Sequence, residues 1–223
     1  MATVTATALC LPAGTALAGC GAGGTGEDRS AGDILDEANA TMRKLNSVTV
    51  DITNRTASGG TVTSHLVTDL DGRSRSRTTW SGGGVLEQIR LGTTDYVRPN
   101  RAYLQKRKKK PGVAGERRLW VKTLVDPASS GDGLTSCERP FDSFGTARKG
   151  DSTRVGDTRA VEVIVTDKAD QGGAYTFYVA EEGEPYLLKT VYKSAAQRTT
   201  FTGFDEPLNV RAPKPGEVLS AGG

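Results

Sequence analysis

The chain has 223 residues, a length that fits one domain with short additional segments. Hydrophobic residues make up 36% and charged residues 25%, and there are 28 glycines, which is typical of a folded, turn-rich protein and excludes a helical bundle or a disordered chain. The net charge of +3 is close to balanced, so the overall charge identifies no class of partner.

Residues 1–19 predict a secretory signal peptide, because they are uncharged, rich in Ala and Thr, and end in small residues. Leu17, Ala18, Gly19 and Cys20 then resemble the lipobox of bacterial lipoproteins, whose cysteine thiol receives a diacylglyceryl group. Two acyl chains anchor a protein stably, so this modification alone would hold the chain at the membrane. The alternative is an Ala-rich start of a cytoplasmic protein that contains LAGC by chance.

A signal peptide ordinarily begins with Lys or Arg, and no charged residue precedes Glu27, so we expect the true translation start to lie upstream of Met1. Residues 20–32 comprise the predicted lipidated cysteine and a Gly-rich, polar tether, which would hold the following domain about 20 Å from the lipid. The domain itself is expected at residues 33–219. It contains no apolar run of about 18 residues or more, so we expect no transmembrane helix there.

Apolar residues recur at helical spacing over residues 33–45, with acidic residues at the start and basic residues at the end, which predicts an amphipathic helix. Val48, Val50 and Ile52 alternate with polar residues and predict the first strand. Glycine-rich turns separate further predicted strands at 61–70, 73–81, 85–91, 95–98, 102–105, 160–166, 175–180, 185–193 and 199–204. Residues 116–125 could form a strand or a short helix, and 126–139 are expected to be a loop. The pattern indicates an antiparallel meander of nine or ten strands.

The C-terminal part carries the most specific pattern, with YTFYVAEEGEPYLLKTVYK followed by TTFTGFDEPLNVRAP and PGEVL. Together with the helix and the meander, it resembles the LolA/LolB-like superfamily, especially the actinobacterial lipoprotein branch that includes LppX and LprG, over residues 31–219. The resemblance implies an α+β, mainly β fold: a strongly curved antiparallel sheet, or half-open barrel, covered by an N-terminal helix and enclosing an apolar cavity. It also implies a protein that binds or carries a lipid-like ligand. The alternative is an envelope-sensing module that contacts a membrane protein partner.

By alternation, eight apolar side chains are expected on the inner face of the sheet, either lining the cavity or packing as ordinary core. They are Val48, Val50, Ile52, Val62, Leu66, Trp80, Phe177 and Phe201. The basic block Lys106, Arg107, Lys108, Lys109 and Lys110 is either a solvated loop or a contact for anionic lipid head groups, where each charge could contribute about 1 kcal/mol. We expect no nucleic-acid partner, because no aromatic residues interleave with the block.

Enzymatic chemistry is not expected from this sequence. His65 is the only histidine and no G-x-S-x-G motif occurs, so a hydrolase triad is not supported, and we expect His65 to be an exposed strand residue. One histidine and one cysteine outside the leader, Cys137, form no familiar metal set and no disulfide framework, so we expect no metal or cofactor. Gly82, Gly83 and Gly84 lack the Lys of a phosphate loop and predict a turn.

Overall fold

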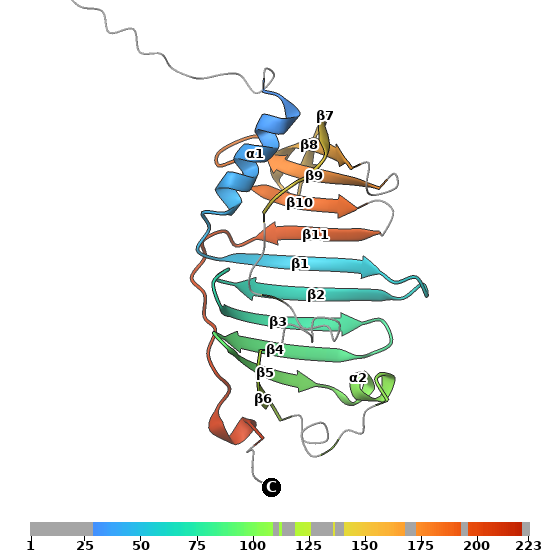
Figure 1. Ribbon diagram of the computed structural model, residues 1–223, viewed down its shortest axis with the longest axis vertical. Coiled ribbons are helices and arrows are strands. Elements are labelled where there is room, and N and C mark those ends of the chain that lie inside the picture. Colours follow the sequence, from blue (N-terminus) through green and yellow to red (C-terminus); the bar gives the residue numbers. More distant parts are fainter. Residues whose placement is uncertain are drawn as a thin grey trace, which may run out of the picture.

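The computed structural model describes residues 29–108, 112, 119–125, 136, 141–167, 173–192 and 196–219. These residues form one 11-stranded sheet with the order β6-β5-β4-β3-β2-β1-β11-β10-β9-β8-β7, in which every neighbouring pair is antiparallel. β6 and β7 stand at the two ends of this order, so the curved sheet stays open. Helix α1 crosses the end of the sheet that contains β8, β9 and β10 (Figure 1). The predicted fold class is confirmed.

The helices are α1 (Ala31–Met42) and α2 (Arg101–Lys106), and a 3-10 turn, η3, covers Pro215–Glu217. The strands are β1 (Val48–Arg55), β2 (Thr61–Thr68), β3 (Arg73–Trp80), β4 (Val85–Leu91), β5 (Thr94–Pro99), β6 (Val121–Leu124), β7 (Thr146–Val155), β8 (Thr158–Thr166), β9 (Ala174–Ala180), β10 (Leu187–Tyr192) and β11 (Gln197–Thr202). Nine of these strands coincide with predicted ones. Within the ambiguous segment 116–125, the described residues 121–124 form a strand, β6, and apart from residue 136 the predicted loop at 126–139 lies outside the described residues.

Two elements differ from the prediction. The strand expected at 102–105 is wrong, because these residues belong to α2, whose N-cap Asn100 accepts a hydrogen bond from the backbone N–H of Tyr103 at 2.8 Å. Strand β7 was not predicted at all. It lies at the edge of the sheet, where most of its side chains are exposed or half-buried, so its sequence shows no apolar alternation.

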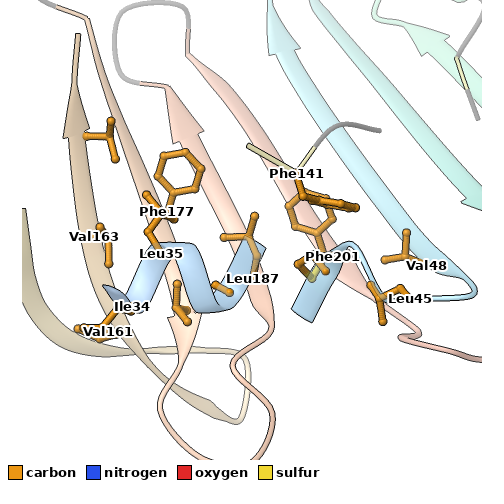
Figure 2. Close-up of a cluster of buried hydrophobic side chains, with 14 of the residues drawn as sticks. Ile34, Leu35, Leu45, Val48, Phe141, Val161, Val163, Phe177, Leu187 and Phe201 are labelled. Carbon is orange, nitrogen blue, oxygen red and sulfur yellow. The ribbon is translucent and has the colours of Figure 1, made fainter. Parts of the chain in front are cut away.

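Helix α1 begins at the N-cap Ser30, whose hydroxyl accepts a hydrogen bond from the backbone N–H of Asp33 at 3.1 Å. Its apolar stripe is buried against the concave face of the sheet, with Ile34 1% and Leu35 3% exposed. Figure 2 shows both side chains beside Val161 and Val163 of β8. The helix therefore forms one side of the main hydrophobic core. No helix among the described residues is long and apolar enough to cross a membrane.

The concave face is divided into an apolar half and a polar half. The apolar half comprises the core residues of β1, β8, β9, β10 and β11 beneath α1, together with Leu66 of β2. Along β2 to β5, the same face instead buries polar side chains, which are Thr68, Ser74, Ser76, Thr78, Gln88 and Asp95. Asp95 accepts hydrogen bonds from Arg90 Nε at 2.9 Å, Arg90 Nη2 at 2.7 Å and Gln88 Nε2 at 3.0 Å. The apolar residues Trp80, Leu86 and Val97 of the polar half form only a small cluster with α2, so the larger apolar surface for a ligand lies in the apolar half.

The convex face carries a row of charged residues at facing positions of five adjacent strands, β1 to β5. Asp51 of β1 accepts a hydrogen bond from Nδ1 of His65 on β2 at 2.7 Å. Glu87 of β4 accepts hydrogen bonds from Arg77 of β3 at 3.1 Å and from Arg98 of β5 at 2.8 Å. The side chain of His65 is 56% exposed, which confirms the expected exposed position. This row lies on the face of the sheet opposite to α1 and contributes to cross-strand pairing.

The turn between β2 and β3 depends on one carboxylate. Asp69 Oδ1 accepts hydrogen bonds from the backbone N–H groups of Asp71, Gly72 and Arg73 at 3.0, 2.9 and 2.8 Å, and Oδ2 accepts from Arg73 Nε at 3.0 Å. Burial is the largest single influence and raises the pKa of Asp69, but the hydrogen bonds from Arg73, Asp71 and Gly72 together lower it below its ordinary value of 3.8. The ionised carboxylate therefore stabilises the turn.

We expect Asp69→Asn to lower the free energy of unfolding by about 1.5–3 kcal/mol at pH 7, because Arg73 loses its charged acceptor and the three backbone N–H groups are left with a neutral amide oxygen. A carboxyl whose pKa is lower in the folded state stabilises above its unfolded pKa and loses that effect as the pH falls through the folded value. The difference between wild type and variant should therefore vanish in acid. Urea unfolding at several pH values measures it, with Asp71→Asn in the same turn as the control. A difference that persisted unchanged in acid would contradict this account.

Candidate functional site

A cavity of about 490 Å³ opens between the C-terminal half of α1, residues 141–144 and the inner faces of β8 to β11. Its volume lies within the roughly 300–1,000 Å³ typical of small-molecule sites. The described lining residues are Asn39, Phe141, Asp142, Ser143, Phe144, Val165, Asp167, Tyr175, Phe177, Leu187, Thr190, Gln197, Thr199 and Phe201. We take this cavity as the candidate ligand site.

Aromatic side chains form much of the wall. Phe141 and Phe201 meet edge to face with ring centroids 5.9 Å apart, and Figure 2 shows the two rings side by side. Tyr175 lies 6.2 Å from Phe177. Phe144 is 78% and Tyr175 40% exposed, so two aromatic side chains stand at the opening while the others are buried deeper. This arrangement suits a ligand with apolar parts.

The segment of residues 141–144 is held in place by α1. Arg43 Nη1 donates to the backbone oxygen of Phe141 at 2.7 Å and to Asp142 Oδ1 at 3.0 Å, and Asn39 Nδ2 donates to Ser143 Oγ at 3.0 Å. These contacts join residues about a hundred positions apart in the sequence. They fix one wall of the cavity relative to the helix.

Gly145 connects this segment to β7 and must be a glycine. Its φ is +120°, and a Cβ there would lie 2.5 Å from the backbone oxygen of Thr166. The close approach brings the end of the 141–144 segment against the end of β8. The position of Phe144 at the opening thus follows from a backbone constraint.

The structure distributes the eight predicted inner-face residues over three places. Phe177 and Phe201 line the cavity. Val48, Val50, Ile52 and Leu66 belong to or pack against the hydrophobic core beneath α1. Trp80 packs in a separate cluster with Leu86, Tyr103 and Leu104, and Val62 faces it across β2 and β3.

Of the fourteen described lining residues, the sequence predicted only Phe177 and Phe201, and three of the other twelve had a recognisable signal in the sequence. Phe141 and Phe144 lie in a short polar segment that showed no periodic pattern, although two aromatic residues in such a segment are a usable signal. Asn39 is only 4% exposed within the apolar stripe of α1, next to Ala38. A polar residue inside an apolar helical stripe was the signal for it.

The described residues of the basic block, Lys106 to Lys108, do not line the cavity. Helix α2, which comes directly after β5, ends at Lys106 and is followed by Arg107 and Lys108. The cavity is built on β8 to β11, in the other half of the sheet (Figure 1). The guanidinium of Arg107 lies 5.3 Å from the centre of the Tyr103 ring. Lys109 and Lys110 lie outside the described residues, as do the lipobox residues 17–19, Cys20 and Cys137.

A second, smaller depression of about 320 Å³ lies on the other side of α1. Its described lining is mostly charged: Arg29, Ile34, Lys149, Ser152, Arg159, Val161, Glu181 and Glu182. Glu181 accepts from Ser152 Oγ at 2.6 Å and lies 3.5 Å from Arg159 Nε, so acidic and basic groups face each other there. An apolar ligand has little surface to contact in it.

Two titratable groups with shifted pKa values lie on the convex face behind the cavity wall. The Lys189 ammonium sits 4.3 Å from the centre of the Tyr178 ring. Burial, with Glu162 nearby, raises the pKa of Tyr178, and burial, with Arg198 nearby, lowers the pKa of Lys189. Within the described part of the chain, no group of His, Cys, Asp and Glu side chains is arranged to hold a metal ion.

An open, curved antiparallel sheet with a helix across its concave face and a cavity beneath that helix defines a half-open barrel of the predicted class. The solved structure of LprF from Mycobacterium bovis has a similar fold, with a TM-score of 0.52 and 14% sequence identity. The match covers 82% of this chain and 96% of LprF. The lipoprotein LppX from Mycobacterium tuberculosis is similar with a TM-score of 0.51 and 11% identity, covering 80% of this chain and 98% of that one.

No family model matches the sequence, and no curated protein matches it. The likeness to LprF and LppX is therefore a likeness of fold. At that level it agrees with the predicted resemblance, because LprF and LppX have the fold that the resemblance implied.

Proposed function

We propose that this protein binds a lipid-like hydrophobic ligand in the cavity between α1, residues 141–144 and strands β8 to β11. The observation that carries the proposal is the aromatic wall, which is buried at Phe177 and Phe201 and reaches the surface at Phe144 and Tyr175. Large apolar side chains gathered at an opening indicate a binding site more often than packing, because folding alone would bury them. The fold shared with the lipoprotein LppX supports the proposal.

We further propose that the protein is exported and held at the outer face of the cell membrane by lipid on Cys20. The support is the uncharged leader, the lipobox Leu17, Ala18, Gly19 and Cys20, and the Gly-rich tether. Metabolic labelling with an alkyne analogue of palmitate in an actinobacterial host tests this anchor. The wild-type protein should carry the label in the membrane fraction, whereas the Cys20→Ser variant should not. The control is the Cys10→Ser variant, which should be labelled as strongly as wild type. Unlabelled wild type would contradict the proposal.

Binding rather than catalysis is the proposed activity. Of the described lining residues, those with side-chain hydroxyls are Ser143, Thr190, Thr199 and Tyr175, and His65 is on the convex face paired with Asp51. A hydroxyl nucleophile in the cavity therefore has no histidine beside it to act as its base. The proposed role is to hold a ligand and release it.

We expect Thr190→Trp to weaken ligand binding at least tenfold. Thr190 is half-buried on the inner face of β10 and lines the cavity, so an indole there would occupy the space of the ligand. Val191→Trp is the matched control, since the next residue of the same strand points to the convex face. Titration with pyrene-labelled dodecanol, followed by fluorescence, measures both affinities. The proposal fails if wild type does not bind the probe, or if both variants bind it as wild type does.

A further inference from the structure

The inner faces of β9, β10 and β11 change from apolar to polar along the strands. At the buried end, Val179 faces Leu187. In the middle, Thr190 faces Phe177 on one side and Thr199 on the other. At the open end, the facing residues are Tyr175, Tyr192 and Gln197. The wall therefore has the polarity gradient of an amphiphile placed with its chain inward.

The hydrogen-bonding groups on this wall are uncharged. Thr190 and Thr199 lie directly opposite each other on β10 and β11, and Gln197 is two residues from Thr199 on the same face. None of these three side chains hydrogen-bonds to another described residue. Two hydroxyls and one amide can both donate and accept hydrogen bonds, which matches the hydroxyl groups of a ligand.

The charged groups of the lining are carboxylates. Asp142 and Asp167 are its charged members, and none of the described lining residues is Lys, Arg or His. Arg43 is nearby, but its guanidinium is bound to Asp142 and to the backbone oxygen of Phe141. The described lining therefore offers an anionic head group no cation to pair with, and the cost of burying an unpaired charge is a means of rejecting a ligand.

We propose that the cavity selects an amphiphile whose polar end is uncharged and carries hydroxyl groups, and that it rejects an anionic one. This inference rests on the proposed function and specifies its ligand class. The apolar chain contacts Phe177, Leu187 and Phe201, and the polar end contacts Thr190, Thr199 and Gln197. The described residues of the basic block, Lys106 to Lys108, are not part of this choice, because they lie at α2 in the other half of the sheet.

Three probes with the same twelve-carbon chain test the proposal, each kept below its micelle concentration and measured by displacement of pyrene-labelled dodecanol. We expect dodecyl maltoside to bind at least tenfold more tightly than dodecyl phosphate, which finds no cation in the described lining, and more tightly than dodecyltrimethylammonium, whose head group has no hydroxyl groups for Thr190, Thr199 and Gln197. Dodecyl phosphate binding as tightly as the maltoside would overturn the charge selection. The ammonium probe binding more tightly than the maltoside would overturn the role of the hydroxyls. If the labelled dodecanol itself does not bind, the proposed function fails instead.

A charge introduced at the open end should reverse the preference. We expect Gln197→Lys to raise the affinity for dodecyl phosphate at least tenfold relative to the maltoside, because it supplies the missing cation. Thr200→Lys is the matched control on the convex face of the same strand and should leave the order unchanged. If the Gln197→Lys variant does not fold, Thr190→Lys replaces it, because it introduces the same charge into the cavity from the neighbouring strand. An unchanged preference in a folded variant would count against the proposal. If dodecyl phosphate still binds to the Thr190→Trp variant, it binds outside the cavity, and that binding does not support the proposal.

Discussion

Asp95→Ala is expected to lower the free energy of unfolding by about 3–5 kcal/mol, the cost of breaking a buried ion pair by removing one partner. Asp95 is 1% exposed, and its carboxylate accepts two hydrogen bonds from Arg90 and one from Gln88. The Arg90 side chain is itself only 14% exposed. Without the carboxylate, its positive charge would lose a partner in a place that water reaches poorly.

Urea unfolding at pH 7, followed by circular dichroism, measures this loss. Asp51→Ala is the matched control, because Asp51 also pairs with a cross-strand base, His65, but its side chain is 53% exposed. Exposed pairs contribute about 0–1 kcal/mol, so the control should change little. Similar losses in the two variants would show that the Arg90–Asp95 pair is not buried as described.

The polar half of the concave face could not be predicted from apolar alternation. In β3, the buried residues Ser74, Ser76 and Thr78 alternate with exposed Arg73, Arg75 and Arg77, so every second residue is buried although none of the six is apolar. The alternation predicts the strand correctly but does not show which face is buried. Thr78 shares a hydrogen bond with Ser64 of β2 at 2.8 Å, and Ser76 donates one to Gln88 of β4 at 3.5 Å, so these partners depend on a strand register that the sequence does not reveal.

The apolar half was easier to predict because its strands carry branched and aromatic residues at every second position. Phe177 and Phe201 were expected on the inner face for this reason, and both line the cavity. The cavity itself depends on contacts from Arg43 and Asn39 to residues 141–144, about a hundred positions away. Such contacts follow from the packing of α1 across the sheet, which no local pattern contains.

Phe201→Ala is expected to lower the free energy of unfolding by about 3–5 kcal/mol while leaving a cavity that still binds ligand. Phe201 is 4% exposed, packs in the core beneath α1 and contacts the ring of Phe141. Removing a buried aromatic ring costs its transfer free energy and leaves empty space. Because Phe201 also lines the ligand cavity, that space should join the cavity and admit a bulkier apolar group.

Phe144→Ala should have the opposite profile, since Phe144 is 78% exposed at the opening of the same cavity. Its removal should change stability by less than about 0.5 kcal/mol, as for most surface substitutions, but weaken the binding of pyrene-labelled dodecanol several-fold through lost apolar contact. Urea unfolding and fluorescence titration on both variants separate the two roles. If Phe144→Ala binds as wild type does, the exposed ring is not part of the site. If Phe201→Ala is as stable as wild type, the aromatic wall is not part of the core, and the cavity must be bounded by other residues.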